Sequence, residues 1–509
     1  MSSVQPSDVQ CHLITYAGEY PAWVAQLAEL IERKTEKPCA VVGTSAQPES
    51  NRSRCQAAWA YDALRKRVAQ ALKPGGSAMR LAGGPTPALC VVLNDDSVAH
   101  GIDVLTLRVG GRAAADLRRS LESAMISGRG ELEIDAVWRR GSSSMKITWR
   151  CALVEWSIAM SMDRVVDKLL GLAEYCLSGN AMGLTPEMPQ PSPIDAFPAM
   201  APLGLLATSL QQAARRLTSR NQWAISIYQD LAPDALWPEK EGIHLVPPVD
   251  RFWADPFLAR DGERLWVFFE ELTYAAPKGK ICCLSIDARG RVGKPFDVLE
   301  EACHLSYPNV FRFDDQWYML PESSERRDLI LYRARSFPND WEPVAQLLTN
   351  VRVVDATLHR DDGNWWLMAG SADSPGGTFD DTLHLYHAVA LNGPWIANPR
   401  NAVRSDPSCS RPAGPLFRWK GQWVRPVQDC RGRYGRALHL LALASIDANG
   451  PHERLLATVC GDERAGVTCA HTYSRVGNDL AVDWMRWRPR WGGRTERPAL
   501  RFAIYGDEA

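Results

Sequence analysis

Residues 251–271, RFWADPFLARDGERLWVFFEE, decide the fold. They predict two short strands joined by a turn at Asp261-Gly262, because an Asp-Gly pair between two apolar runs is a strong hairpin signal. The same pattern returns at 306–322 (SYPNVFRFDDQWYMLPE), at 354–370 (VDATLHRDDGNWWLMAG) and at 411–427 (RPAGPLFRWKGQWVRPV). A shorter copy, HTYSRVGNDLAVDW, spans 471–484. One strand-turn-strand unit is therefore repeated five times.

The spacing of these copies predicts how they assemble. They open at Asp255, Pro308, Asp355, Pro412 and Thr472, with gaps of 53, 47, 57 and 60 residues. A repeat of about fifty residues that is built from strands is typical of a β-propeller, in which each repeat forms one four-stranded blade. We therefore expect an all-β, five-bladed β-propeller.

Composition limits the remaining possibilities. The formal net charge of the 509 residues is −1, so no overall basic field attracts nucleic acid, and we expect no nucleic-acid partner. The 13 cysteines are odd in number and include no Cys-x-x-Cys pair, which favours a reducing compartment. No apolar run approaches the roughly 20 residues needed to span a bilayer, and the N-terminus lacks the pattern of a signal peptide. We therefore expect a cytoplasmic protein without a transmembrane segment.

Strands alternate with helical stretches in the first third of the chain. Short apolar strands are predicted at 9–16, 39–42, 88–93 and 102–107, with helices at 21–34 and 57–72 between them. An antiparallel pair (132–138 and 144–149) and a long helix (154–177) follow. This alternation predicts an N-terminal α/β, Rossmann-like domain with a mainly parallel sheet.

We divide the chain into four segments. They are the α/β domain (1–182), a Pro-rich linker and helix (183–221), the propeller (222–495) and a C-terminal tail (496–509). The strand at 222–228 should close the propeller by pairing with the 473–491 region, which removes an exposed edge.

The order of elements in the N-terminal domain, with the stretch HGIDVLTLRVGG at 100–111, resembles the sugar and methionyl-tRNA formyltransferases. The resemblance implies a catalytic Asn-x-His motif, which residues 1–200 lack. It therefore implies a formyltransferase-like domain without the activity. Asn94-Asp95-Asp96, after a predicted strand, lies where open α/β sheets bind ligands, although a solvated loop is the simpler interpretation.

The symmetry of a propeller predicts where chemistry gathers. The first residues of the inner strands and the last residues of the return strands meet at one mouth of the central channel. The strand openings contribute Trp253, Asp255, Tyr307, Asp355, Arg411 and His471. The return strands contribute Glu270, Glu271, Glu322, Ser371, Gln428, Asp429 and Asp483. Repulsion between clustered carboxylates raises the pKa of one and leaves its neighbour ionised, as an acid and a base or nucleophile require. For each acid taken alone, a structural ion pair is an equally good explanation.

Several motifs carry a family resemblance. WADPFL (253–258), HLSYPNVF (304–311), LPESSE (320–325), RPAGPLF (411–417), RPVQDCRGRYGRA (425–437) and HTYS (471–474) resemble the five-bladed propellers of the glycosidase clan, which includes arabinanases and invertases. The propeller domain N-terminal to plant glucosamine inositolphosphorylceramide transferases is the most similar. The resemblance implies that Asp255 is a nucleophile or base and that Asp355 stabilises the transition state. No blade opens with the family's catalytic Glu, and Glu322 or Glu271 is the best substitute for that acid.

Three functions remain open. The first is a glycosidase or glycosyl-transferring enzyme of polysaccharide or glycolipid metabolism, acting at the channel mouth. In it Trp253, Tyr307, Arg411, Gln428, Asp429, Arg433, Tyr434 and His471 would bind the substrate. The second is a non-catalytic sugar-binding propeller that assists a separate glycosyltransferase partner, and the third is a scaffold. We expect no cofactor and no metal, because ligand spacing across blades is not diagnostic and His384-x-x-His387 on a strand points its rings to opposite faces.

Overall fold

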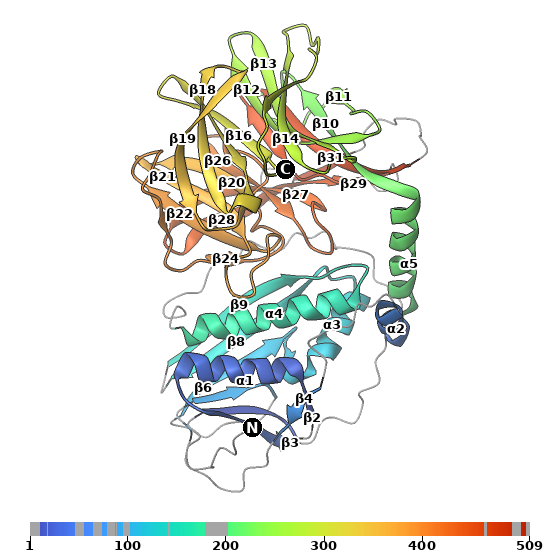
Figure 1. Cartoon of the computed structure of the whole chain (residues 1–509), viewed down its shortest axis with the longest axis vertical. Coiled ribbons are helices and arrows are strands. Elements are labelled where there is room, and N and C mark those ends of the chain that lie inside the picture. The colour runs from blue at the N-terminus through green and yellow to red at the C-terminus, as the bar shows by residue number, and fades with distance from the viewer. Residues whose placement is uncertain are drawn as a thin grey trace.

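The computed structural model describes residues 11–17, 19–45, 55–64, 74–78, 87, 89–94, 102–140, 143–178, 202–462, 466–490 and 500–504. An α/β domain is followed by a five-bladed β-propeller, which lies above it in Figure 1. In the described part of the chain no helix is long and apolar enough to cross a membrane.

Each repeat forms one antiparallel blade around the channel. Blade 1 comprises β12 (Arg251–Asp261), β13 (Arg264–Thr273), β14 (Gly279–Ile286) and β15 (Phe296–Leu299). Blade 2 comprises β16 (Ser306–Phe313), β17 (Gln316–Glu322), β18 (Asp328–Ser336) and β19 (Asp340–Thr349). Blade 3 comprises β20 (Val353–Asp361), β21 (Asn364–Ser371), β22 (Thr382–Ala388), β23 (Ile396–Ala397) and β24 (Arg404–Ser405). The hairpins predicted from the repeated stretch are therefore confirmed in these blades.

The last two blades bring distant segments together. Blade 4 comprises β25 (Phe417–Trp419), β26 (Gln422–Asp429), β27 (Ala437–Asp447), β28 (Gly450–Gly461) and β32 (Leu500–Ile504). Blade 5 comprises β10 (Ser219–Tyr228), β11 (Ile243–Leu245), β29 (Val467–Cys469), β30 (Tyr473–Val476) and β31 (Asp479–Pro489). Because β10 pairs along its whole length with β31, the predicted closure of the ring is confirmed.

One strand lies in the segment that we assigned to a C-terminal tail. β32 pairs with β28 at the outer edge of blade 4, and the ring of Phe502 stacks on Trp237 with centroids 5.5 Å apart. Residues 500–504 therefore belong to a blade, because their backbone groups and an aromatic side chain find partners there.

The N-terminal domain contains one mixed sheet in the order β3-β1-β5-β6-β8-β9. The pairs β1–β3, β1–β5 and β5–β6 are parallel, whereas β6–β8 and β8–β9 are antiparallel. These strands are β1 (Cys11–Tyr16), β3 (Cys39–Ser45), β5 (Leu89–Val92), β6 (Asp103–Val109), β8 (Glu131–Arg140) and β9 (Ser143–Ala152). Three short strands complete the domain: β2 (Glu19–Pro21), β4 (Pro74–Ser77) and β7 (Arg112–Ala113).

Helices cover one face of this sheet, where α1 and α4 lie side by side (Figure 1). The helices are α1 (Ala22–Thr35), α2 (Gln56–Leu64), α3 (Leu117–Ile126) and α4 (Ile158–Leu177). The fifth helix, α5 (Pro202–Thr218), leads into the propeller. The predicted Pro-rich linker lies almost wholly outside the described residues, as do Asp95 and Asp96.

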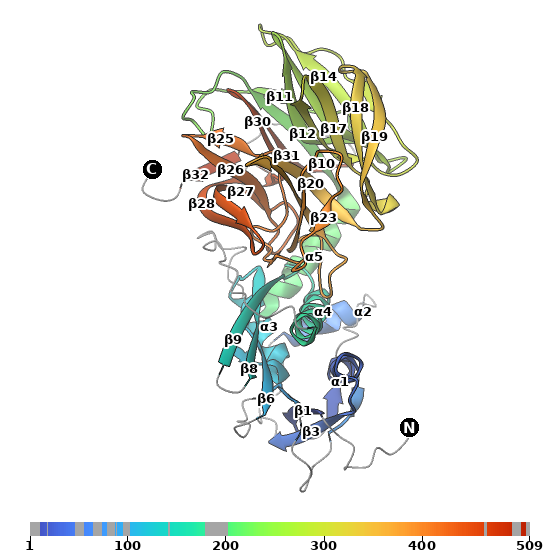
Figure 2. The ribbon, with the colours of Figure 1, turned by 90° about the vertical axis from the view of Figure 1, so that its left-hand side faces the viewer.

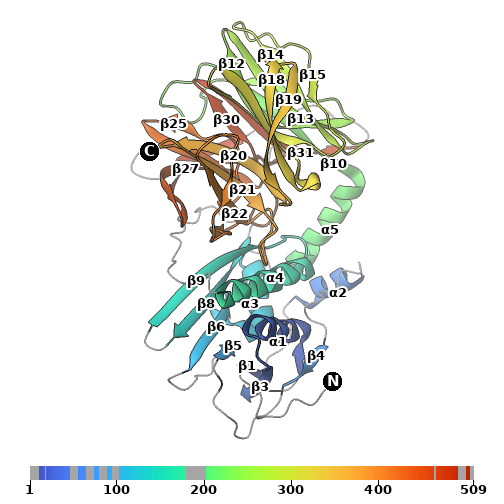
Figure 3. The ribbon, with the colours of Figure 1, turned by 60° about the vertical axis from the view of Figure 1, so that its left-hand side comes forward.

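Helix α4 packs against the propeller (Figures 2 and 3). Lys168 is buried and donates to Asp381 at 2.7 Å and to Ser405 at 3.1 Å. A side chain at Gly171 would overlap the backbone of Pro375, so the helix needs a glycine there to approach this closely. The two domains are therefore held together by a buried ion pair and by direct backbone packing.

Candidate functional site: the mouth of the propeller channel

Three blades open with the same backbone irregularity. The register of the inner hairpin shifts at Asp255 in blade 1, at Tyr307 in blade 2 and at Asp355 in blade 3. These three residues have φ of 51°, 45° and 53°, a region that side chains other than glycine rarely adopt. A bulge redirects a side chain, and such strain persists only where its surroundings hold it.

Carboxylates from other blades hold these strained residues. The backbone N–H of Asp255 donates to Asp483 Oδ2 at 3.0 Å, and that of Asp355 donates to Glu322 Oε2 at 3.2 Å. The N–H of Tyr307 donates to Asp255 Oδ2 at 3.2 Å. Every one of these bonds joins two blades, so the openings are positioned by the closed ring rather than by local sequence.

Asp255 lies in a dense hydrogen-bond network. Its Oδ1 accepts from the hydroxyl of Thr472 at 2.9 Å and lies 3.6 Å from Nε2 of His471. On the other side of the ring, Nδ1 of His471 lies 2.5 Å from Asp483 Oδ2. The imidazole also stacks on Trp223, with centroids 3.9 Å apart. His471 therefore joins two carboxylates across the first and fifth blades.

Asp355 is paired with a cation. Its Oδ2 accepts from Arg411 Nε at 2.6 Å and from Gln428 Nε2 at 3.0 Å. The guanidinium of Arg411 lies over the ring of Tyr434, 4.7 Å from its centroid, and Tyr434 is 39% exposed. Tyr434 also meets His471 edge to face at 5.3 Å. The two halves of the mouth thus meet at an exposed aromatic ring.

Burial and neighbouring charges divide the roles of these groups. Burial raises the pKa of Asp255 to about 7 and that of Glu322 to about 8, with Asp355 adding to the second shift. Burial alone would lower the pKa of His471, but the carboxylates of Asp483 and Asp255 outweigh it and raise the pKa to about 9. At neutral pH Glu322 is therefore largely protonated and His471 is positively charged, while Asp255 is present in both its protonated and its ionised form.

The other predicted residues lie in separate places. Glu271 accepts hydrogen bonds from Arg251 at 3.1 Å and from the indole of Trp253 at 2.9 Å, so these three side chains bind one another. Asp429 is buried between Arg431 and Arg436, whose charges outweigh the effect of burial and hold its pKa well below the usual range. Tyr307 is fully buried, and its hydroxyl lies 2.8 Å from that of Thr357.

Arg433 faces the N-terminal domain rather than the channel. Its Nη1 lies 3.4 Å from Glu155, and its Nη2 donates to the carbonyl oxygen of Thr468. Among the predicted residues, the mouth therefore brings together Asp255, Glu322, Asp355, Arg411, Gln428, Tyr434, His471 and Asp483.

Two residues of this network were missed. Asp380, in the loop between β21 and β22, accepts from Arg411 Nη1 at 3.3 Å and lies 3.7 Å from Arg164 of α4. Adjacent acids in the loop GGTFDDT were the only signal for Asp380, and Arg164 looks like any polar residue of an amphipathic helix. The N-terminal domain thus connects to Asp355 through three successive ion pairs, Arg164–Asp380, Asp380–Arg411 and Arg411–Asp355.

Asp255, His471 and Asp483 also have a spacing suited to a metal ion, with one ligand atom of each within 4.8 Å of the others. His471 already lies between the two carboxylates, 2.5 Å from Asp483 and 3.6 Å from Asp255, and its protonated ring supplies the positive charge that this acidic group needs. The observed arrangement therefore balances its charge with protein groups alone.

The propeller is similar in sequence to a known protein family. Residues 246–464 match the family model described as "Glucosamine inositolphosphorylceramide transferase 1, N-terminal". The propeller is a homologue of this domain. Glucosamine inositolphosphorylceramide transferase 1 of Oryza sativa subsp. japonica is 33% identical over 248 residues, which are 44% of this chain and 33% of that protein. The Arabidopsis thaliana protein of that name is 31% identical over 192 residues, 37% of this chain and 25% of its own length.

This chain therefore spans a third or less of the length of these relatives. Among solved structures, a family 117 glycoside hydrolase of Zobellia galactanivorans is similar over 53% of this chain and 91% of its own. Its sequence identity is 10% and its TM-score is 0.33, so its catalytic residues give no guidance here.

Proposed function

We propose that the protein is a carbohydrate-active enzyme, a glycosidase or a glycosyl-transferring enzyme of polysaccharide or glycolipid metabolism, with its active site at the propeller mouth. One observation carries the proposal. Two buried carboxyl groups of raised pKa, Asp255 and Glu322, flank an aspartate that is ion-paired to Arg411. Glycosyl transfer requires this division between an acid and a base or nucleophile.

The roles follow from the charge states. Glu322, neutral at pH 7, would donate its proton to the leaving oxygen as the glycosidic bond breaks. Asp255 would attack the anomeric carbon itself, or would accept the proton of an incoming hydroxyl that forms the new bond to that carbon. Asp355, held by Arg411 and Gln428, would stabilise positive charge that develops on the sugar ring. Glu271 is the weaker candidate for the acid because Arg251 and Trp253 already bind its carboxylate.

A second function is favoured by a different observation. Asp255 and Asp355 are only 5% and 2% exposed, and both oxygens of Asp255 already accept hydrogen bonds. Such satisfied carboxylates suit a sugar-binding propeller that presents substrate to a separate glycosyltransferase. In that case Arg411 and Tyr434 would bind the sugar, and no bond would break.

The remaining assignments belong to this proposal. The parallel strands β3-β1-β5-β6 support a Rossmann-like, formyltransferase-like N-terminal domain whose lost activity leaves it a structural role beside the mouth. The scattered cysteines support a cytoplasmic location, where an activated nucleotide sugar or a lipid-linked sugar is the natural substrate.

The test is a screen of the full chain against aryl glycosides and nucleotide sugars, with Asp255→Asn as the matched variant. Turnover by the wild type and its loss in the variant, with sugar binding kept, would support the enzyme. Sugar binding by both proteins without turnover of any glycoside would select the binding module. If no sugar is bound or turned over, both functions are rejected.

A further inference from the structure

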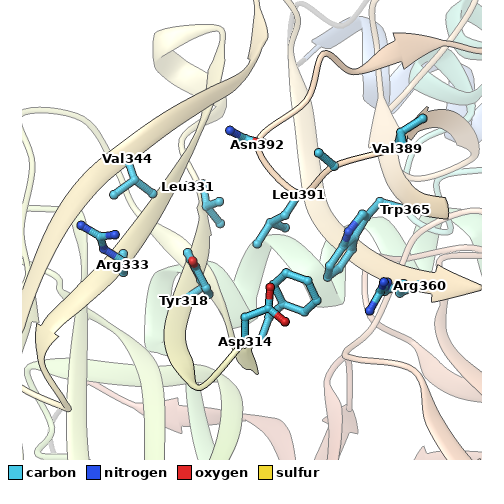
Figure 4. A pocket seen from close by; sticks show the side chains of 12 residues that line it. Asp314, Tyr318, Leu331, Arg333, Val344, Arg360, Trp365, Val389, Leu391 and Asn392 are labelled. Atoms are coloured by element: carbon cyan, nitrogen blue, oxygen red, sulfur yellow. The ribbon is translucent and has the colours of Figure 1, made fainter. Parts of the chain in front are cut away.

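A hollow lies at the end of the inner strands opposite to the mouth. Phe313 ends β16, Asp314 follows it, and Arg360 lies near the end of β20, whereas Tyr307 and Asp355 of the mouth lie at the starts of these strands. The hollow, which we call the interblade pocket, separates blades 2 and 3 and has a volume of about 490 Å³ (Figure 4). Pockets that hold small molecules typically measure about 300–1,000 Å³.

The walls of the interblade pocket combine aromatic and aliphatic side chains with the polar groups of Asp314, Arg333, Arg360 and Asn392. Tyr318 and Trp365 lie on opposite sides of it, with Leu391 between them (Figure 4). Val389 and Val344 line its edge and are 82% and 40% exposed. Exposed apolar side chains around a hollow favour a ligand with an apolar face, because covering them removes apolar surface from water.

Two hydrogen-bond donors in the pocket have no partner within the part of the chain that the structure describes. Trp365 is 6% exposed, yet its indole Nε1–H donates to no residue in the described ranges. The hydroxyl of Tyr318 likewise makes no hydrogen bond to the described part of the chain. Both atoms face the open hollow, where water satisfies them until oxygen atoms of a bound molecule take its place. The pocket therefore offers donors to oxygen atoms of a bound molecule.

One cation in the pocket is also available. The guanidinium of Arg360 lies 5.2 Å from the ring centroid of Phe313 and 5.9 Å from that of Trp365. It forms no ion pair with any described carboxylate, whereas Arg333 on the opposite wall is paired with Glu342 at 2.6 Å. An arginine held over aromatic rings with its N–H groups open is suited to an anionic group.

We propose that the interblade pocket binds a sugar residue that carries an acidic group, separately from the mouth. The C–H face of the ring packs on the aromatic and aliphatic walls, its hydroxyl oxygens accept from Tyr318 and Trp365, and its acid pairs with Arg360. This site goes beyond the proposed function, because the pocket holds an anchored glycan and breaks no bond.

Titration of the full chain with three sugars tests the proposal. The sugars are methyl glucoside, methyl glucuronide and glucose 6-sulfate, followed by calorimetry and by ligand-detected NMR. We expect saturable binding of an acidic sugar, at least about tenfold tighter than that of methyl glucoside, since an ion-paired hydrogen bond contributes more than a neutral one. Preference for the glucuronide or for the sulfate identifies the acid.

Variants locate the binding site. Arg360→Gln should weaken the acidic sugar about tenfold and leave methyl glucoside unchanged, whereas Tyr318→Phe should weaken both sugars severalfold. Arg312→Gln is the matched control, because this arginine lies on the same rim over Trp317 but outside the pocket. The proposal is overturned if no acidic sugar binds saturably, or if Arg360→Gln and Tyr318→Phe both bind it like the wild type.

Discussion

The two ends of the propeller's inner strands have opposite characters. At the mouth, charged side chains from all five blades are buried, paired with one another and connected to helix α4. At the far rim, two blades enclose an open hollow in which Arg360, Tyr318 and Trp365 have no ion-pair or hydrogen-bond partner among the described residues. Closure of the ring forces the strand starts together, so that the charged side chains there change one another's pKa values. At the far rim, the residues of the interblade pocket come from blades 2 and 3 alone.

The largest expected effect is on turnover at the mouth. Asp255→Asn should lower kcat about 10²–10⁴-fold, the range in which a positioned acid or base contributes, while the fold and sugar affinity persist. Asp315→Asn, in the exposed turn at the far rim, is the matched control and should retain full activity. Steady-state kinetics on the substrate found by screening measures both. Equal activity of the two variants would remove the catalytic distinction between the two ends.

The next effect concerns helix α4, which packs against the propeller on the side of the mouth. Lys168→Ala should cost about 3–5 kcal/mol of stability at the domain interface, because Asp381 would be left buried without its cation. Lys34→Ala breaks the more exposed pair with Glu174 and should cost less than about 1 kcal/mol. Thermal unfolding measures both variants. Similar midpoints for the two would show that α4 is not held by this ion pair.

Lys168→Ala also separates the two ends functionally. Loosening α4 should impair turnover through the contacts from Arg164 to Arg411, while the affinity of the interblade pocket stays at the wild-type value. Loss of binding at the rim in this variant would mean that the two ends are not independent.

A smaller effect is the pH dependence of stability. The pKa values of Asp255 and Glu322 are raised in the folded state to about 7 and 8, so the native protein binds more protons than the unfolded chain above about pH 4. Each unit of raised pKa corresponds to about 1.4 kcal/mol, so stability should fall by several kcal/mol as pH rises from about 4 to 8. His471 has the same sign, since its contribution is complete below about pH 6.5 and is lost through about pH 9.

Urea unfolding at several pH values checks this sign. Asp255→Asn should flatten the fall between pH 4 and 7, and Asp315→Asn should leave it unchanged. A wild type whose stability rises over that interval would show that the mouth carboxylates are not destabilised by burial.

Some residues of the mouth could be predicted from the sequence and others could not. Asp255 and Asp355 were identifiable because they occupy equivalent positions in repeats that a ring must bring together. Glu271 and Glu322 were not distinguishable, since both end return strands, and only the fold shows that Arg251 and Trp253 bind the first. Asp380 could not be inferred because it lies in a loop without a counterpart in other repeats.

The consecutive residues Trp365 and Trp366 show what the alternation of side chains along a strand does predict. Consecutive residues of a strand point to opposite faces, so the two indoles must separate. Trp366 packs on His387 with ring centroids 5.8 Å apart, while Trp365 lines the interblade pocket. Which of the two faces a hollow depends on the gap between neighbouring blades, and this gap is set by tertiary packing.

A crystal structure of Asp255→Asn soaked with the sugar substrate tests whether sugar chemistry takes place at the mouth. We predict a sugar ring within hydrogen-bond distance of Arg411 and Glu322, with its anomeric carbon facing residue 255. A sugar found at the interblade pocket while the mouth remains filled only by its own side chains would contradict this prediction.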